Sequence, residues 1–300
     1  MVDKVIKTLE EYGPMTGKEL QQKVQLDDFY LWKICNTHEE IITKTIGKRY
    51  LRFDIQVEGY ARLSPSIVRE FYSYTIVGLK KDIEKISEKI KTLNKTIIDI
   101  SRDKFRLAYE VMKQIVETNE NAEVLKKYVC FLIAGDVVFE MAHLEPRPES
   151  STGKLVKGSD LDIVVVTKGL PDSLVNNIDL LIYNKKNFLL KNPSYNEEID
   201  YVVKDISKVK EQLEFKDFKS MIASKVLYES QFLYGSYEMY EDIKEMVKEA
   251  GIPQKIAELE EKAEIDRSNA RMYLLKAKVP LAEEESLKLF YTKEEKEEFF

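Results

Sequence analysis

Two aspartates, one residue apart, lead directly into a run of β-branched residues. The run is Gly158-Ser159-Asp160-Leu161-Asp162-Ile163-Val164-Val165-Val166. Its β-branched residues predict a buried strand. Because side chains alternate along a strand, Asp160 and Asp162 project from the same face. Two neighbouring carboxylates repel each other and are costly unless a cation lies between them.

Magnesium is the cation that fits this pair. It prefers hard oxygen ligands, commonly one or two carboxylates, and completes its octahedron with water and substrate phosphates. The pair therefore predicts metal-assisted phosphoryl chemistry. The structural alternative is a strand start whose acids only cap a turn.

The sequence around this run alternates between strand and helix. Residues 128–134, 161–167 and 199–203 are short apolar runs typical of strands, whereas residues 137–143 and 173–188 have helical spacing. Strands that alternate with helices predict an α/β domain with a mixed sheet.

Two further segments carry a family resemblance. They are Ile133-Ala134-Gly135-Asp136 upstream and Glu198-Ile199-Asp200-Tyr201-Val202-Val203 downstream. With the aspartate pair, they make residues 126–230 resemble the DNA polymerase-β-like nucleotidyltransferases. The resemblance implies an NTP as donor, pyrophosphate as product, and two Mg²⁺ ions, for which Mn²⁺ can substitute. It assigns both metals to Asp160 and Asp162, and one of them to Asp200.

Asp179 is the rival for the third carboxylate. As a strand residue it would leave about five residues after Pro171 for a crossover that normally needs a dozen. Its neighbours also fit a helical stripe. Asp200 is therefore preferred.

The same resemblance implies a nucleotide site. Its residues are Gly135, Asp136, Ser159, Lys225 and Tyr228. The family has a serine where this chain has Asp136. Three alternatives stay open: Asp136 caps the helix that follows, the nucleotide is held differently, or activity is weak. The polar loop 145–157 offers Arg147, Lys154 and Lys157 as phosphate contacts, or else is a solvated surface loop.

The first 65 residues resemble a winged helix-turn-helix module in their pattern. Three short helices are expected, with Thr16 and Asp27 or Asp28 as caps, then a hairpin of residues 40–44 and 48–53 about Gly47. A winged helix makes RNA or DNA an expected partner; the cations for it are Lys33, Lys48, Arg49 and Arg52. The alternative is a structural or protein-binding module, because the third helix begins with two acids.

The remaining segments predict helices. Residues 66–123 contain no proline, and isoleucines and a leucine between Ile83 and Ile100 recur at alternating steps of three and four residues. This spacing predicts a coiled coil that dimerises, or one arm of an intramolecular bundle. Residues 217–248 and 253–278 are expected to be long helices, followed by an acidic tail whose Leu287, Phe290, Phe299 and Phe300 dock on the rest of the chain.

Four segments follow from these patterns. They are a winged-helix-like module (1–65), a helical spacer (66–125), a nucleotidyltransferase α/β domain (126–212) and a helical domain with an acidic tail (213–300). The chain should be predominantly helical overall. Residues 211–300 carry 14 basic and 21 acidic side chains, so any nucleic-acid binding must be local.

Composition excludes several classes of protein. Two cysteines and two histidines cannot form a disulfide framework or a Cys/His zinc site. No apolar run approaches the roughly 20 residues of a spanning helix, and no signal-peptide pattern opens the chain, so we expect a cytoplasmic protein without a membrane partner. We expect a nucleotidyltransferase whose acceptor is a hydroxyl of a tRNA-like nucleic acid or of a protein. A DNA-binding regulator with an inactive, nucleotide-sensing domain is the alternative, and a coiled-coil scaffold is a third.

Overall fold

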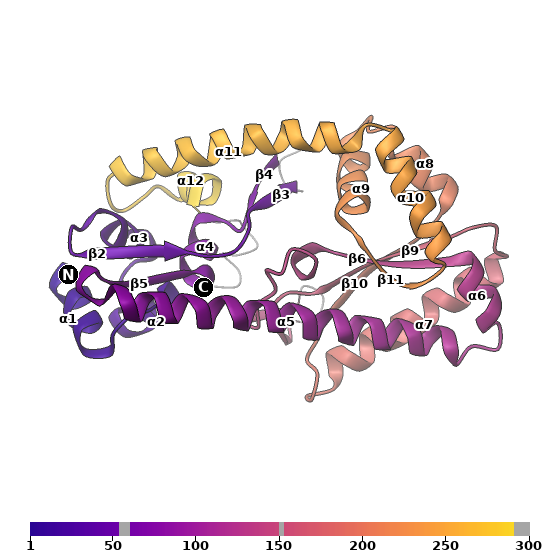
Figure 1. The fold of residues 1–300 in the computed structure, drawn as a ribbon, viewed down its shortest axis with the longest axis horizontal. Coiled ribbons are helices and arrows are strands. Elements are labelled where there is room, and N and C mark those ends of the chain that lie inside the picture. Colours follow the sequence, from indigo (N-terminus) through magenta and orange to yellow (C-terminus); the bar gives the residue numbers. More distant parts are fainter. Residues whose placement is uncertain (54–60, 150–152, 291–300) are drawn as a thin grey trace. The chain divides into compact units, whose positions relative to one another are not determined.

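Helices make up most of the chain in the computed structural model, and small sheets lie among them (Figure 1). The structure describes residues 1–53, 61–149 and 153–290. These residues divide into two compact units. Unit 1 comprises residues 1–53, 61–97 and 259–290, and unit 2 comprises residues 98–149 and 153–258. The predominantly helical composition that the sequence predicts is confirmed.

Unit 1 begins with three short helices. They are α1 (Val2–Tyr12), α2 (Gly17–Val24) and α3 (Asp28–Thr37). Thr16 and Glu19 form a capping box at the start of α2, and Asp27 accepts a hydrogen bond from the Tyr30 amide at the start of α3. Both caps satisfy amides that have no partner within the helix. The three predicted helices and their caps are confirmed.

The sheet of unit 1 differs from the expected hairpin. β1 (Met15–Thr16), β5 (Thr75–Leu79) and β2 (Ile41–Thr45) form one antiparallel sheet with β5 in the middle. β3 (Tyr50–Phe53) pairs instead with β4 (Ala61–Ser64). Strands 40–44 and 48–53 were therefore correctly expected, but their pairing as a hairpin is wrong. β2 finds its partner about 30 residues further along the chain.

The prediction of nearly continuous helix over residues 66–123 is also wrong, at residues 75–82 and at the turn of residues 118–121 after α5. α4 (Ile67–Tyr74) ends where β5 begins, and the 3₁₀ turn η1 (Lys80–Asp82) leads into α5 (Ile83–Glu117). Thr75, Ile76 and Val77 are buried. All three are β-branched, which favours a strand over a helix. Ile86 and Ile97, two members of the expected coiled-coil seam, are buried.

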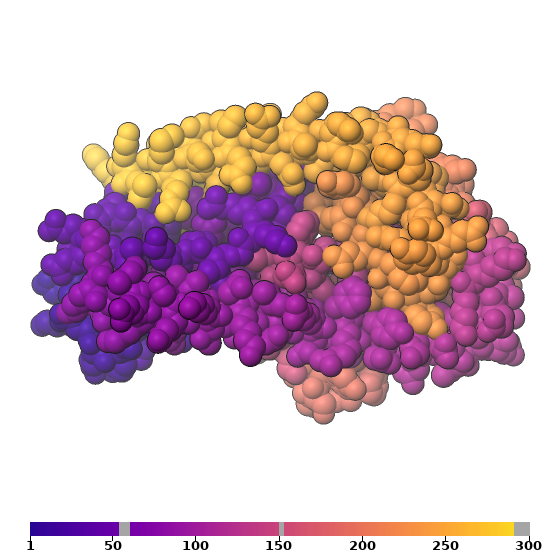
Figure 2. Space-filling model, in the orientation of Figure 1, coloured from indigo at the N-terminus to yellow at the C-terminus, as the bar shows by residue number. Residues whose placement is uncertain are grey.

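The C-terminal part of unit 1 packs on its N-terminal helices. α11 (Ile252–Lys276) is followed by the short helices α12 (Glu283–Glu285) and η3 (Ser286–Phe290). The Phe290 ring meets the rings of Phe29 and Trp32 edge-on at 5.5 and 5.7 Å. In Figure 2 the yellow C-terminal residues lie against the indigo N-terminal ones. The predicted docking of Phe290 is confirmed, whereas Phe299 and Phe300 lie outside the described residues.

Unit 2 is built on a four-stranded sheet in the order β10-β9-β6-β11. β9 and β10 are parallel, whereas β6 is antiparallel to both β9 and β11. The strands are β6 (Val129–Ala134), β9 (Leu161–Thr167), β10 (Ile199–Asp205) and β11 (Gln231–Gly235). A separate two-stranded hairpin joins β7 (Pro146–Pro148) to β8 (Leu155–Lys157). The strands expected at 128–134, 161–167 and 199–203 are confirmed.

Helices cover both faces of this sheet. The helices are α6 (Ala122–Tyr128), α7 (Asp172–Lys191), α8 (Ile206–Gln212), α9 (Phe218–Glu229) and α10 (Tyr237–Glu249). Residues of α5 and α7 form one core with Leu161, Ile163 and Val165 of β9. α8, α9 and α10 lie on the other side of the sheet (Figure 1).

Two predictions in unit 2 are wrong. The helix expected over 137–143 is only the 3₁₀ turn η2 (Gly135–Val137), and Glu140 follows with a positive φ of 59°. That left-handed backbone ends a helix. The helix expected over 217–248 is interrupted by β11, so Tyr234 lies on a strand and not on one helix with Tyr237 and Tyr240. Phe232, Leu233 and Tyr234 favour a strand.

The remaining composition-based expectations concern the cysteines and the membrane. Cys35 and Cys130 are both free and buried, and burial raises the pKa of each thiol to about 12. They are core thiols, as predicted. Over the described residues, no helix combines the length and the apolar character needed to cross a bilayer.

Candidate functional site

The three predicted aspartates lie on one face of the unit 2 sheet. Asp162 of β9 is the in-register partner of Asp200 on the parallel strand β10. Partners at one level of a sheet project from the same face, and so do residues two apart on one strand. Asp160 precedes β9 by one residue and therefore shares this face with Asp162. The rival Asp179 lies on helix α7 instead.

This face is open near the aspartates. The opposite face is filled by α5 and α7, which bury Leu161 and Ile199 completely. On the aspartate face, Asp200 and Val202 of the edge strand β10 are exposed. A ligand can therefore approach Asp160, Asp162 and Asp200 from the side of β10.

Gly135 makes close contact with Asp162. Ala134 is the register partner of Asp162 on β6, and Gly135 follows it with φ +70°. A Cβ atom on Gly135 would lie 1.9 Å from Asp162 Oδ2. The carboxylate thus occupies the space that any other residue would fill. Only glycine allows both this backbone conformation and this approach.

Asp136 belongs to a hydrogen-bond network and does not cap a helix. Ser159 Oγ donates to Asp136 Oδ2 at 2.6 Å. The His143 amide donates to Ser159 Oγ at 3.2 Å, and the Ser159 amide donates to the His143 carbonyl at 3.1 Å. Because the turn after Gly135 is so short, Asp136 is drawn toward the Gly-Ser-Asp-Leu-Asp segment. It adds a fourth carboxylate to the group.

The pKa values of Asp160 and Asp162 are both raised at this site. Burial is the main cause that raises the pKa of Asp162 well above its usual range, and the charges of Asp160, Asp136, Asp200 and Glu229 add to it. Burial also raises the pKa of Asp160, against the opposing effect of Arg147. Negative charge is therefore in excess here, and the site favours a bound cation.

Arg147 of the β7–β8 hairpin lies beside this group. Its Nη2 atom is 2.9 Å from Glu198 Oε2 and 3.4 Å from Asp160 Oδ2, and its Nε donates to the Gly158 carbonyl at 2.8 Å. Glu198 is buried and lies two residues before Asp200, directly before β10 begins. The predicted phosphate loop thus contributes one arginine directly to the site.

The residues predicted on α9 lie near the glycine turn. Lys225 forms an ion pair with Glu229, and Glu229 Oε1 accepts a hydrogen bond from the Gly135 amide at 3.4 Å. Lys225 also lies 5.5 Å from the centre of the Phe139 ring. Tyr228, on the same helix, is exposed. The structure therefore brings Lys225 and Gly135 together through Glu229.

Sequence reasoning missed Glu198 and Glu229 as members of the site. Glu198 repeats the acid-x-acid pattern of Asp160 and Asp162 one strand away, which is a signal that could have been used. Glu229 lies four residues after Lys225, the usual spacing of a helical ion pair. Nothing local in the sequence says that this pair faces Gly135.

The site residues match Mg²⁺ in the type of ligand atom they offer, but not yet in their arrangement. Asp160, Asp162 and Asp200 supply the hard oxygens that the ion prefers. In the described part of the chain, however, no three His, Cys, Asp or Glu side chains converge as a closed ligand set. Asp160 faces Arg147 and Asp162 faces Gly135. The donors fit the ion, and binding it requires these carboxylates to turn.

The cations predicted to contact nucleic acid lie in unit 1. Lys33 Nζ donates to the Ala277 carbonyl. Arg49 Nε donates to Glu70 Oε2 at 2.6 Å. Lys48 and Arg52 are exposed. The third helix of the module is also covered by the segment that carries Phe290.

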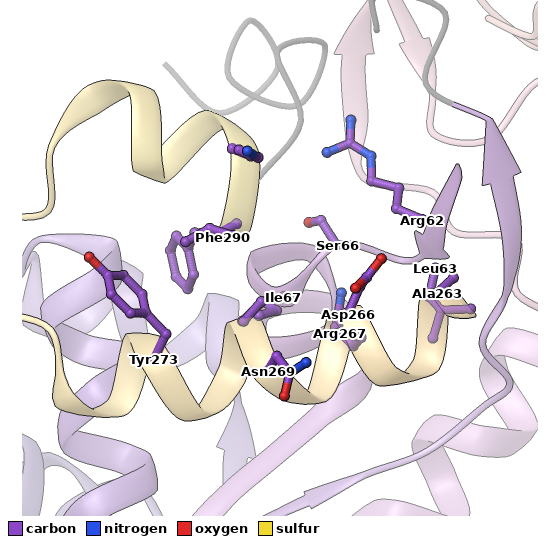
Figure 3. A pocket seen from close by; sticks show the side chains of 13 residues that line it. Arg62, Leu63, Ser66, Ile67, Ala263, Asp266, Arg267, Asn269, Tyr273 and Phe290 are labelled. Carbon is purple, nitrogen blue, oxygen red and sulfur yellow. The ribbon is translucent and has the colours of Figure 1, made fainter. Parts of the chain in front are cut away.

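Unit 1 also contains a cavity of about 470 Å³ between α4, α11 and η3. Figure 3 shows Tyr273 and Phe290 on one side of it and Arg62 on the other. Arg267, another lining residue, donates to the Pro65 carbonyl at 3.0 Å and to Glu70 Oε2 at 3.1 Å. Its guanidinium therefore connects α11 to α4, a role that explains it without a ligand.

Comparison with known proteins does not assign the chain to a family. No protein-family model matches the chain, and no curated protein matches it either. Function must therefore be argued from the residues themselves.

Proposed function

We propose that unit 2 is a Mg²⁺-dependent nucleotidyltransferase that moves a nucleoside monophosphate from an NTP to a hydroxyl group. The observation that carries the proposal is the in-register pairing of Asp162 with Asp200, with Asp160 on the same face. Three carboxylates from two neighbouring parallel strands are thereby presented on one face, beside a glycine turn that lets the Asp162 carboxylate approach the backbone closely.

Each residue has a role in this reaction. Asp160, Asp162 and Asp200 would hold Mg²⁺, which neutralises triphosphate charge and favours loss of the acceptor's proton when bound. Asp200, on the exposed edge strand, faces the side from which an acceptor arrives. The acceptor oxygen attacks the α-phosphorus, the bond to the β-phosphate oxygen breaks, and pyrophosphate leaves. On α9, next to the turn, Lys225 would contact a phosphate and Tyr228 the base.

The acceptor is an RNA or DNA hydroxyl, or a protein hydroxyl. Unit 1 carries Lys48 and Arg52 on its surface, which supports a nucleic acid. The acidic balance of residues 211–300 supports a protein. The nucleotide and the acceptor can be identified together by incubating the chain with each labelled NTP and with total RNA or total protein.

The test is pyrophosphate release with Mg²⁺ or Mn²⁺. We expect Asp162→Asn and Asp200→Asn to lower it more than about 100-fold, since each removes a charged ligand. Asp179→Asn is the matched control, because Asp179 is an exposed acid on α7 of the same unit. It should leave the rate unchanged. Equal loss in all three variants, or no pyrophosphate from the unchanged chain, would contradict the proposal.

A second candidate function is nucleotide sensing without turnover. Two observations favour it. Asp136 adds a carboxylate where the family that unit 2 resembles has a serine, and Arg147 Nη2 lies 3.4 Å from Asp160 Oδ2, where it competes with a metal ion. Nucleotide binding without pyrophosphate release would support this sensor, whose output would pass to a nucleic acid bound by unit 1.

A further inference from the structure

The β7–β8 hairpin delivers a single cation to the carboxylate group. Its first strand is Pro146-Arg147-Pro148, and Arg147 pairs in register with Val156 of β8. Prolines restrict the backbone on both sides of Arg147. Val156 is buried, and register partners share a face. The Arg147 side chain is thereby directed to the interior of unit 2.

The contacts of the guanidinium are unequal. Its Nε donates a hydrogen bond of 2.8 Å to the Gly158 carbonyl, and its Nη2 forms an ion pair with Glu198 Oε2 at 2.9 Å. The Nη2–Asp160 distance is 3.4 Å, so this contact is the weakest of the three. Gly158 and Glu198 therefore anchor Arg147, and the contact with Asp160 can be exchanged without releasing the side chain.

The site also remains accessible at this point. The Arg147 side chain is 16% exposed and that of Asp160 is 36% exposed. By contrast, Lys104, another buried cation of unit 2, is held by Glu197 at 2.5 Å and by the Lys157 carbonyl at 2.8 Å. Arg147 is thus a cation that an incoming ligand can reach, and it is held by Gly158 and Glu198.

We propose that Arg147 binds a phosphate of the incoming triphosphate and, before that, acts as the counter-ion of Asp160. This inference rests on the proposed function, because it assigns the phosphate contact of the same site. When Asp160 turns to a metal ion, it leaves Arg147, whose planar fork then meets phosphate oxygens while Glu198 and Gly158 hold it in place. A guanidinium matches phosphate geometry better than an ammonium does.

This exchange predicts opposite effects on two ligands. In Arg147→Ala, Asp160 loses a competing cation, so Mn²⁺ alone should bind several-fold more tightly. The same variant loses a charge-assisted phosphate contact, so ATP, GTP, CTP or UTP with Mg²⁺ should bind about 10- to 100-fold more weakly. Arg147→Lys keeps the charge but not the planar fork. Its affinities for both ligands should therefore lie between those of the unchanged chain and those of Arg147→Ala. A purely structural arginine would weaken both ligands.

The experiment measures Mn²⁺ binding by electron paramagnetic resonance and nucleotide binding by calorimetry on the full chain. Lys168→Ala is the matched control: Lys168 is an exposed cation of unit 2 just past the end of β9 that is away from Asp160, and its Nζ lies 3.4 Å from Asp242 Oδ2. It should change neither affinity. Circular dichroism melting identifies a misfolded variant, in which case Arg147→Lys decides. Weaker Mn²⁺ binding or unchanged nucleotide binding in the arginine variants would overturn the inference.

The two proposals can fail separately. If the unchanged chain binds nucleotide without releasing pyrophosphate, the transferase is wrong, whereas the Arg147 contact is still judged by the two affinities. If it binds none of the four nucleotides, both are overturned.

Discussion

Glu70 of unit 1 and Asp162 of unit 2 differ in the charges around them: arginines surround Glu70, whereas acids surround Asp162. In unit 1, the Glu70 side chain is 6% exposed and lies among Arg49, Arg267 and Arg271. In unit 2, Asp162 lies among Asp160, Asp136, Asp200 and Glu229. The negative charge of Glu70 is therefore compensated within the chain. The group around Asp162 contains more acids than Arg147 and Lys225 can neutralise, so negative charge remains in excess and favours an external cation.

The contrast distinguishes an acid that stabilises the fold, Glu70, from an acid that is available to bind a ligand, Asp162. Glu70 of α4 is neutralised by Arg49, directly before β3, and by two arginines of α11, so it holds these three parts of unit 1 together. An acid among other acids lowers the stability of the fold, so its presence calls for a ligand. The two units can therefore be distinguished by removing one acid from each and measuring stability.

The largest effect is expected at Glu70. Glu70→Ala leaves Arg49, Arg267 and Arg271 without their shared carboxylate, and breaking a buried ion pair by removing one partner costs about 3–5 kcal/mol. Chemical denaturation should show this loss in the free energy of unfolding. Glu84→Ala, which removes an exposed acid of α5, is the control and should change stability by less than about 0.5 kcal/mol. A similar small change at Glu70 would show that the arginines are satisfied elsewhere.

The opposite sign is expected at Asp162. Without metal, Asp162→Asn should leave the free energy of unfolding unchanged or raise it, because it removes one member of the repelling group. The pKa of Asp162 is raised on folding, so its ionised form costs stability above the folded pKa. That cost declines as the pH falls through the folded pKa toward the unfolded one.

Denaturation of both chains in chelator, between pH 7 and pH 4, measures this dependence. The advantage of Asp162→Asn should be greatest at pH 7 and shrink toward pH 4, where the aspartate of the unchanged chain is protonated in turn. A variant much less stable at pH 7 would place Asp162 in the same structural class as Glu70.

The sequence predicts the acids better than it predicts their surroundings. Asp160 and Asp162 belong to one strand, so their common face follows from the two-residue period alone. Asp200 could be chosen over Asp179 because a crossover needs a minimum length. Arg147 and Glu229 reach the site through a hairpin and a helix whose docking depends on contacts far apart in sequence, and no local period reveals that docking.

The same distinction holds for the fold. Thr16, Glu19 and Asp27 act within one turn of helix, and these caps are predicted correctly. β2 pairs with β5 and not with its neighbour β3, and β11 interrupts a helical pattern to pair with β6. Both outcomes depend on competition among distant partners, which a single sequence does not display. Residues 75–79 were missed because the helical pattern resumes so soon after them.

The smallest expected effect concerns the surface of unit 1. Each lysine or arginine that contacts a phosphate releases counter-ions, so losing it reduces the slope of log affinity against log salt by about 0.9 on duplex DNA. If unit 1 binds nucleic acid, Lys48→Ala with Arg52→Ala should reduce this slope by about 2. Lys33→Ala should leave it unchanged, because Lys33 Nζ is held by the Ala277 carbonyl. Arg49 is unsuitable for this test, since it also stabilises Glu70.

Filter binding of a labelled duplex over a range of salt concentrations gives the slopes. A decrease with Lys33→Ala alone would mean that the Ala277 segment moves away from α3 when nucleic acid binds, and that unit 1 is less self-contained than its charge pairing indicates.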